Sequence, residues 1–199
     1  MASAERRARV ERETKETQIV VDLNLDGTGI TDIDTGIGFF DHMLEAFGRH
    51  GMFDLIVRAT GDLNVDAHHT VEDVGIVMGQ AFAQAMGDKR GIVRFASPAI
   101  AMDEALILAA VDVSGRGQLH FDVDVPPCML GAFDSSLAKE FFIALASNAQ
   151  VTLHIKELAG ENVHHIIEAS FKAVSRALCA ALEINPRMAD ALPSTKGVL

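Results

Sequence analysis

Two short stretches of the chain, DAHHTVED at residues 66–73 and NVHHIIEA at residues 162–169, each place two adjacent histidines ahead of a glutamate. On a helix, adjacent side chains point about 100° apart, whereas residues three or four apart share a face. His68 and His69 are therefore poorly placed to hold one ion together. Each could instead reach a different ion, with Glu72 beside both.

The second copy of this motif carries His164, His165 and Glu168 at the same spacing. The two copies hold four of the eight histidines in the chain, and random placement does not explain that repeat. Imidazole nitrogen with carboxylate oxygen, and no thiolate, suits Mn, Fe, Ni or Zn, and a six-coordinate site with open positions favours manganese. If pseudo-symmetry brings the copies together, within one chain or between subunits, two metal sites would share parts of both motifs.

The elements that must position these motifs are repeated too. In the first half, alternating apolar and polar residues over 17–34 predict two strands in a hairpin around an Asp26–Gly27 turn. A helix is expected over 39–50, a strand over 52–60, and a second helix over 68–86, where apolar residues recur at helical spacing.

After Gly91 the same order returns. Two or three strands are expected within 95–125, then a helix over 135–149, a strand over 151–158 and a long helix over 162–183. A repeat on this scale indicates duplication. The predicted fold is α+β, with two fused similar halves, each a mainly antiparallel sheet with two helices packed on one face. The expected organisation is a single domain, 1–199, with pseudo-repeats at about 17–91 and 92–185 and a C-terminal tail, 186–199.

Composition excludes some classes of partner. The formal net charge of -11 argues against nucleic acid, because a phosphate backbone needs a basic surface. The absence of Trp and Tyr leaves Phe alone for stacking on bases. A small anion is still allowed, since it needs only a few local Arg and Lys side chains.

The thiols and the apolar runs indicate a compartment. Cys128 and Cys179 are the only cysteines, and the N-terminal stretch is charged without the apolar segment of a signal peptide, which fits reduced thiols in a cytosol. The longest apolar run, near 105–113, is far shorter than a membrane span. We therefore expect a cytoplasmic protein with no membrane partner.

Four longer stretches, FFDHMLEAFGRHG, DAHHTVEDVGIVMGQA, TLHIKELAGENVHHIIEASFKAVSRAL and the terminal STKGV, resemble the imidazoleglycerol-phosphate dehydratase family of histidine biosynthesis. The resemblance runs from about Thr17 to Val198, with the motifs in the family's order and at similar spacing. Because no phosphatase domain is attached, the chain resembles the monofunctional form.

This resemblance implies an activity. D-erythro-imidazole-glycerol phosphate would lose water to give imidazole-acetol phosphate, through a metal-bound imidazolate and a diazafulvene intermediate. Family members use two manganese ions per active site. They assemble into 24-subunit shells made of trimers, with active sites between subunits.

The resemblance also implies site residues, matched motif by motif. The implied metal ligands are His42, His68, His69, Glu72, Glu140, His164, His165 and Glu168. Glu140 departs from the pattern, because some family members have histidine at that position, although a carboxylate can still bind manganese.

For substrate, the resemblance implies catalytic roles for Glu16, Glu72, Glu168 and Lys172. The implied contacts to substrate or its phosphate are Glu16, His42, His50, Arg94, Arg116, Lys172, Ser194, Thr195 and Lys196. A phosphate needs such cations and hydrogen-bond donors.

Two other functions fit the same motifs. One is another dinuclear metalloenzyme, a hydrolase acting on a small phosphorylated substrate through a metal-bound hydroxide. The other is a non-catalytic metal-binding protein whose histidine motifs stabilise an oligomer. Neither alternative accounts for the set of longer motifs.

Overall fold

A computed structural model of the protein describes residues 6–188 and 191–199. Its elements run, in chain order, β1 (Arg7–Glu13), β2 (Thr17–Asn24), β3 (Thr31–Asp34), α1 (Gly38–Gly51), β4 (Asp54–Gly61), α2 (His68–Met86), β5 (Phe95–Ala96), β6 (Ala99–Met102), β7 (Ala105–Asp112), β8 (Gln118–Asp122), β9 (Met129–Leu130), β10 (Phe133–Asp134), α3 (Leu137–Ala149), β11 (Thr152–Ala159) and α4 (Val163–Leu182).

The two halves have the same topology. The first sheet has the order β1-β2-β4-β3, and the second has β5-β7-β11-β8 with β6 also paired to β7. In each sheet one pair is parallel, β3 with β4 and β8 with β11, and the other pairs are antiparallel. By position in the repeat, α1 of the first half corresponds to α3 of the second, and α2 corresponds to α4. The predicted α+β fold of two similar halves is confirmed.

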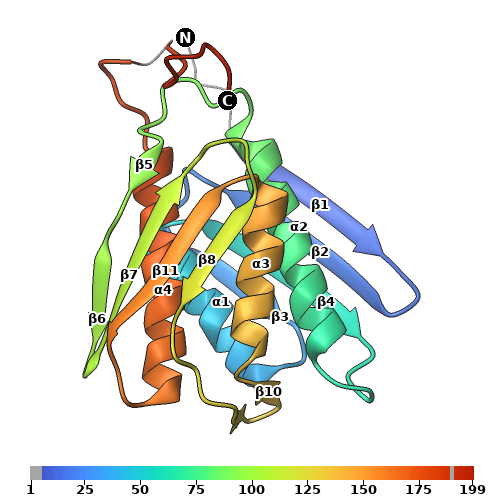
Figure 1. Ribbon diagram of the computed structural model, residues 1–199. Helices are drawn as coiled ribbons and strands as arrows, with labels where there is room; N and C mark the ends of the chain where they lie inside the picture. Colours follow the sequence, from blue (N-terminus) through green and yellow to red (C-terminus); the bar gives the residue numbers. More distant parts are fainter. Residues whose placement is uncertain (1–5, 189–190) are drawn as a thin grey trace.

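The helices lie between the two sheets (Figure 1). α2 packs on β1 and β2 of the first sheet, α4 packs on β7 of the second, and the helices meet as the pairs α1 with α4 and α2 with α3. In β7 every second residue is buried, so one face of the sheet covers the helices while the other faces outward. Burial of these apolar faces is the main force that joins the halves.

Phenylalanines from both halves fill the space between the sheets. Phe141 of α3 stacks on Phe171 of α4 with 5.0 Å between ring centroids, and Phe40 of α1 meets Phe141 edge-on at 5.4 Å. All three rings are fully buried. The shared core fixes α1 against α4, which carry two of the sequence motifs.

Glycines set the distance between α2 and α3. A Cβ at Gly75 would lie 2.8 Å from the Cβ of Ala144, and one at Gly79 would lie 2.7 Å from the carbonyl oxygen of Leu145. Larger residues there would push the helices apart. Close packing keeps the first turn of α2, with its histidines, beside the start of α3.

The hairpin predicted over 17–34 is wrong. Both strands form, but β4 lies between β2 and β3 in the sheet. β2 pairs antiparallel with β4, and β3 pairs parallel with β4. Local alternation located the strands, whereas the pairing depends on a strand that follows later in the chain.

The charged N-terminal stretch, for which the sequence predicted no regular element, contains β1. This edge strand forms the hairpin with β2, and Arg12 and Glu13 lie opposite Ile19 and Gln18. In the second half, the stretch 95–125 holds four strands where two or three were expected. The described residues of the tail after Pro186 form turns and no regular element, as expected.

Candidate active site

Polar side chains fix where the two HHxxE helices begin. Asp66 Oδ1 accepts a hydrogen bond from the backbone N–H of His68 at 2.8 Å, and Asn162 Oδ1 accepts one from that of His164 at 2.9 Å. Asn and Asp are favoured at helix starts because they satisfy backbone donors that lack a partner within the helix. Each histidine pair therefore stands on the first turn of its helix.

The strongest candidate for a metal site combines both halves. His42 of α1 meets His164 and Glu168 of α4, with one ligand atom from each residue lying within 4.8 Å of the others. Glu168 Oε2 lies 3.1 Å from His164 Nε2 and 3.5 Å from His42 Nε2. Within residues 6–188 and 191–199, no other group of three His, Cys, Asp or Glu side chains converges in this way.

Glu168 is buried and held as a carboxylate. Its side chain is 8% exposed, and its Oε1 receives Lys172 Nζ at 2.7 Å. Burial would raise the pKa of Glu168, but the hydrogen bond and charge of Lys172, with the hydrogen bond to His164, lower it overall. Lys172 was expected on the same helix face as His164. In the structure both side chains contact Glu168.

The adjacent histidines turn away to other carboxylates. His165 Nδ1 donates to Glu104 at 2.8 Å, and His69 Nδ1 donates to Asp62 at 3.0 Å. The rings of each adjacent pair are nearly perpendicular, 78° for His164 with His165 and 88° for His68 with His69. The histidines of each pair therefore face different groups, and the expectation that each reaches a different ion stays a prediction.

These carboxylates change the titration of their histidines. The hydrogen bonds to Asp62 and Glu104 raise the pKa of His69 and of His165. The same bond from His165, helped by the backbone N–H of Asn162, lowers the pKa of Glu104 to about 2.

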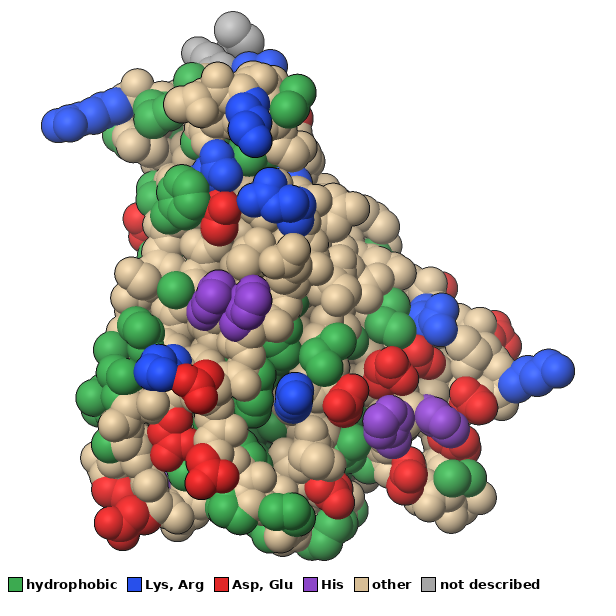
Figure 2. All heavy atoms as spheres, in the orientation of Figure 1, with side chains coloured by type: hydrophobic (Ala, Val, Ile, Leu, Met, Phe, Trp, Pro, Cys, Tyr) green, Lys and Arg blue, Asp and Glu red, His purple; other side chains and the backbone are tan. Residues whose placement is uncertain are grey.

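The HHxxE motif of the first half is more exposed to solvent than that of the second half. His68 Nε2 lies 3.8 Å from Glu72 Oε2, and Glu16 Oε2 lies 3.9 Å from His69 Nδ1. Figure 2 shows acidic side chains gathered around a pair of histidines over the lower part of α2. Glu140, in the first turn of α3, is half-buried and does not join a three-residue cluster among the described residues. Its role as a ligand stays a prediction.

A buried aspartate holds the hairpin that carries Glu16 close to this motif. Asp73 of α2 accepts from Arg12 Nε at 3.0 Å and from the hydroxyl of Thr17, which ties both strands of the β1–β2 hairpin to the helix. Glu16 stands in the turn of that hairpin. The ion pair therefore keeps Glu16 near His69.

A cavity of about 490 Å³ adjoins His68. Its walls come from the segment before α1, the turn before α2 and the β9–β10 region, among them Ile37, Asp66, Met129 and Ser136. The cavity gives the first-half motif room for a small molecule or for another chain.

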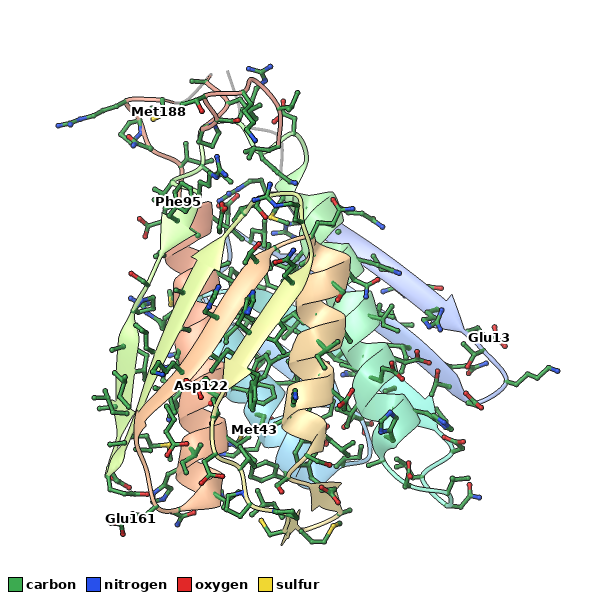
Figure 3. The ribbon with its side chains drawn as sticks, viewed as in Figure 1. Glu13, Met43, Phe95, Asp122, Glu161 and Met188 are labelled. Atoms are coloured by element: carbon green, nitrogen blue, oxygen red, sulfur yellow. The ribbon has the colours of Figure 1, made fainter. Side chains whose placement is uncertain are left out.

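The residues expected to bind phosphate come together at the other end of α4. Arg94, Arg116, Ser194, Thr195 and Lys196 line a cavity of about 140 Å³ with Ser114, Val198 and Leu199. Arg94 is fixed by Asp112 at 2.8 Å and by the carbonyl of Pro193 at 2.7 Å. Lys and Arg side chains gather over this region in Figure 2, and Phe95, under the Arg94 guanidinium, is labelled there in Figure 3.

His50 lies at the end of α1, near Lys172. Burial lowers the pKa of His50, and the positive charge of Lys172 lowers it further. The sequence did not single out Asp62 or Glu104, because each meets its histidine only through the fold. For Asp62, the seven-residue separation from His69 is a weak signal; Glu104 and His165 are 61 residues apart.

The fold and the cluster define the class: an α+β protein of two similar halves, with histidine and carboxylate ligands of the kind that bind divalent metals. A family model described as imidazoleglycerol-phosphate dehydratase matches residues 35–178. Proteins named imidazoleglycerol-phosphate dehydratase are 62% identical in Acidiphilium cryptum, over 98% of this chain and 99% of the relative, and 58% identical in Dinoroseobacter shibae, over 98% and 100%.

Solved structures agree. The Staphylococcus aureus imidazoleglycerol-phosphate dehydratase superposes with a TM-score of 0.81 at 40% identity, covering 90% of this chain and 99% of that one. The Pyrococcus furiosus enzyme, in complex with (S)-C348, gives 0.82 at 39%, covering 96% and 100%. This chain belongs to the imidazoleglycerol-phosphate dehydratase family, and it is a hydro-lyase. No helix among its described residues is long and apolar enough to cross a membrane.

Proposed function

We propose that the protein dehydrates D-erythro-imidazole-glycerol phosphate to imidazole-acetol phosphate in a metal-dependent reaction. Family membership supports the dehydration step in histidine biosynthesis. The observation that carries the metal dependence is the meeting of His42, His164 and Glu168 across the two halves. The intermediates implied by the resemblance stay predictions.

The donor set fits a divalent metal such as manganese. Two imidazole nitrogens and a buried carboxylate converge, and no thiolate is present that would favour a softer ion. His42, His164 and Glu168 would hold one ion. We propose that the ligands of a second ion come from the expected set of His68, His69, Glu72, Glu140 and His165. When bound, the metal would act as a Lewis acid and template for the imidazole ring of the substrate.

Side chains around the cluster would manage protons and hydroxyls. Lys172, hydrogen-bonded to Glu168 Oε1, has ammonium protons left to donate to a substrate hydroxyl. Glu16 stands on an exposed turn next to His69, where it could take a proton from a substrate bound there. His50 would complete the substrate-binding side at the end of α1.

The phosphate would bind at the cavity formed by Arg94, Arg116 and the 194–199 segment. Arginine, lysine and hydroxyl groups are suited to phosphate oxygens. Asp112 holds the mostly buried Arg94 at 2.8 Å, whereas Arg116 is exposed and lies 4.0 Å from the same carboxylate, so Arg116 and Lys196 are the more available cations.

The positions of these two regions support an active site shared between subunits. The histidine motif starts α4 at His164, whereas Arg94 contacts the carbonyl of Ala181 near the end of the same helix. Seventeen helical residues span about 25 Å, which is too far for one small substrate. A metal cluster and the phosphate cavity that serves it would therefore come from different chains. We therefore propose an assembly of several subunits, for which the family resemblance implies 24 chains arranged as trimers. A cytoplasmic location is a separate proposal, based on the biosynthetic family.

The test is turnover of imidazole-glycerol phosphate by chelator-treated protein, with and without added Mn²⁺. Mass spectrometry should show loss of one water only when metal is present. Release of inorganic phosphate instead would favour the hydrolase alternative. Equal dehydration with and without metal would overturn the metal dependence while leaving the reaction in place.

A further inference from the structure

Each histidine pair has one ring whose Nδ1 is held by a carboxylate from outside the motif. Asp62 Oδ2 lies 3.0 Å from His69 Nδ1, and Glu104 Oε2 lies 2.8 Å from His165 Nδ1. A carboxylate can only accept here, so Nδ1 carries the proton. In the neutral ring the remaining nitrogen, Nε2, is then the one that offers a lone pair, and in His165 this nitrogen lies 3.8 Å from Asp103 Oδ2.

The two carboxylates come from different elements. Asp62 directly follows β4, whereas Glu104 lies in the turn between β6 and β7, and β4 corresponds to β11 in the repeat. The β6–β7 turn corresponds in the repeat to the β1–β2 turn, where Glu16 Oε2 lies 3.9 Å from His69 Nδ1. A carboxylate therefore faces Nδ1 from the same turn in both halves, and in the first half Asp62 makes the shorter contact.

Glu104 is itself well anchored. Its Oε1 accepts from the backbone N–H of Asn162 at 2.9 Å and of Glu161 at 3.4 Å, in the turn that leads into α4. Glu161 is labelled at this end of the molecule in Figure 3. The carboxylate thus connects the β6–β7 turn to the start of the helix that carries His165.

Three other histidines of the candidate site, two from the motifs and one from α1, point the opposite nitrogen at carboxylates. His68, His164 and His42 all direct Nε2 toward a glutamate. A ring anchored through Nδ1 likewise presents Nε2, so one nitrogen type is offered throughout. A carboxylate on the far nitrogen of a metal-binding histidine fixes its tautomer and ring orientation and makes it a stronger ligand.

We propose that Asp62 and Glu104 are positioning residues that hold His69 and His165 with Nε2 aimed at a divalent metal ion. This inference rests on the proposed metal site. It adds two residues outside both HHxxE motifs. It also separates the roles of the two histidines in a pair, since His164 lies in the cluster whereas His165 is oriented by Glu104.

The experiment measures Mn²⁺ binding to the full-length metal-free protein by electron paramagnetic resonance of free Mn²⁺. Asp62→Ala and Glu104→Ala should each weaken binding at the affected site by about 10- to 100-fold. Asp62→Asn and Glu104→Gln keep an acceptor oxygen and should restore most of the affinity. Asp122→Ala is the matched control, because that carboxylate pairs with Lys156 on β11 away from the motifs.

A second measurement separates orientation from folding. ¹⁵N magic-angle-spinning NMR of histidine-labelled, metal-free protein, at a pH high enough for both rings to be neutral, should show two rings protonated at Nδ1 and free at Nε2. One of these signals should disappear in each alanine variant and persist in the amide variants. Loss of helix structure without loss of the tautomer signal would assign Glu104 a purely structural role.

The outcomes distinguish the two proposals. If the unsubstituted protein binds no Mn²⁺, the proposed metal dependence fails, and the positioning roles of Asp62 and Glu104 fail with it. If it binds Mn²⁺ and the alanine variants bind equally well, the metal site stands and the positioning roles of Asp62 and Glu104 are refuted.

Discussion

Lys172 Nζ lies 2.7 Å from Glu168 Oε1, and the other oxygen of that glutamate faces His164 and His42. One buried carboxylate therefore joins an ammonium group on one side to a candidate metal cluster on the other. The lysine lowers the pKa of Glu168 against the effect of burial, which keeps the carboxylate charged for a metal.

Replacing Lys172 with methionine should leave that buried charge without its cation. We expect metal-free protein to lose about 2 kcal/mol of unfolding free energy, below the roughly 3–5 kcal/mol of a fully buried pair because Lys172 is partly exposed. Added Mn²⁺ should stabilise the variant more than the unsubstituted protein, since the ion supplies the missing positive charge. Denaturant unfolding with Lys139→Met as an exposed control checks this; an unchanged free energy would contradict it.

His164→Ala should lower kcat by more than about 100-fold, because partners that merely orient metal ligands are already worth about 10- to 100-fold. The control is His120→Ala, which removes an exposed ring on β8. Steady-state kinetics at saturating Mn²⁺ would measure both variants. Similar losses in the two would show that any histidine substitution harms the protein and that the cluster has no special role.

Deleting residues 194–199 removes much of the wall of the cavity around Arg94 and Arg116. Charge-assisted hydrogen bonds are worth about 1.5–3 kcal/mol each, so KM should rise at least about 10-fold. Arg187→Ala, in the same terminal region but not part of that wall, serves as the control. An unchanged KM for the truncated protein would rule out phosphate binding by this segment.

Asp54 should make stability depend on pH. Burial would raise the pKa of its carboxyl, but hydrogen bonds from the backbone of Thr28 and Ile30 and from Asn24 lower it overall. A lowered pKa means that the stabilisation is complete above the pKa of the unfolded chain and is lost as pH falls through the lower folded value.

Asp54→Asn should therefore reduce unfolding free energy near pH 7, and the difference from the unsubstituted protein should shrink below about pH 4. Urea unfolding at several pH values measures that difference. A difference that stays constant down to about pH 3 would show that the charge of Asp54 does not support the loop at residues 27–30.

Periodicity predicted the helices well, because Phe40, Phe47, Phe141 and Phe171 fall on faces that the core buries. The order of the strands within each sheet was harder to predict. β4 separates β2 from β3, and that order depends on tertiary packing instead of the Asp26–Gly27 turn. β1 was missed because five of its seven residues are charged, with only Ala8 and Val10 apolar, and because it lies at the sheet edge.

The site was predictable in type and only partly in geometry. The repeated HHxxE spacing identified the histidines, and the family resemblance supplied His42, Lys172 and the phosphate residues. Spacing alone could not pair His42 with Glu168, since they meet across the two halves. For the same reason it gave no sign of Glu104, which reaches His165 through the β6–β7 turn.

The most direct test of the metal cluster is anomalous X-ray diffraction from crystals of the protein grown with Mn²⁺, collected on both sides of the manganese absorption edge. A manganese peak within bonding distance of His42 Nε2, His164 Nε2 and a Glu168 oxygen is the predicted result. Manganese bound elsewhere, with these three side chains hydrogen-bonded to one another as in the metal-free chain, would contradict the account.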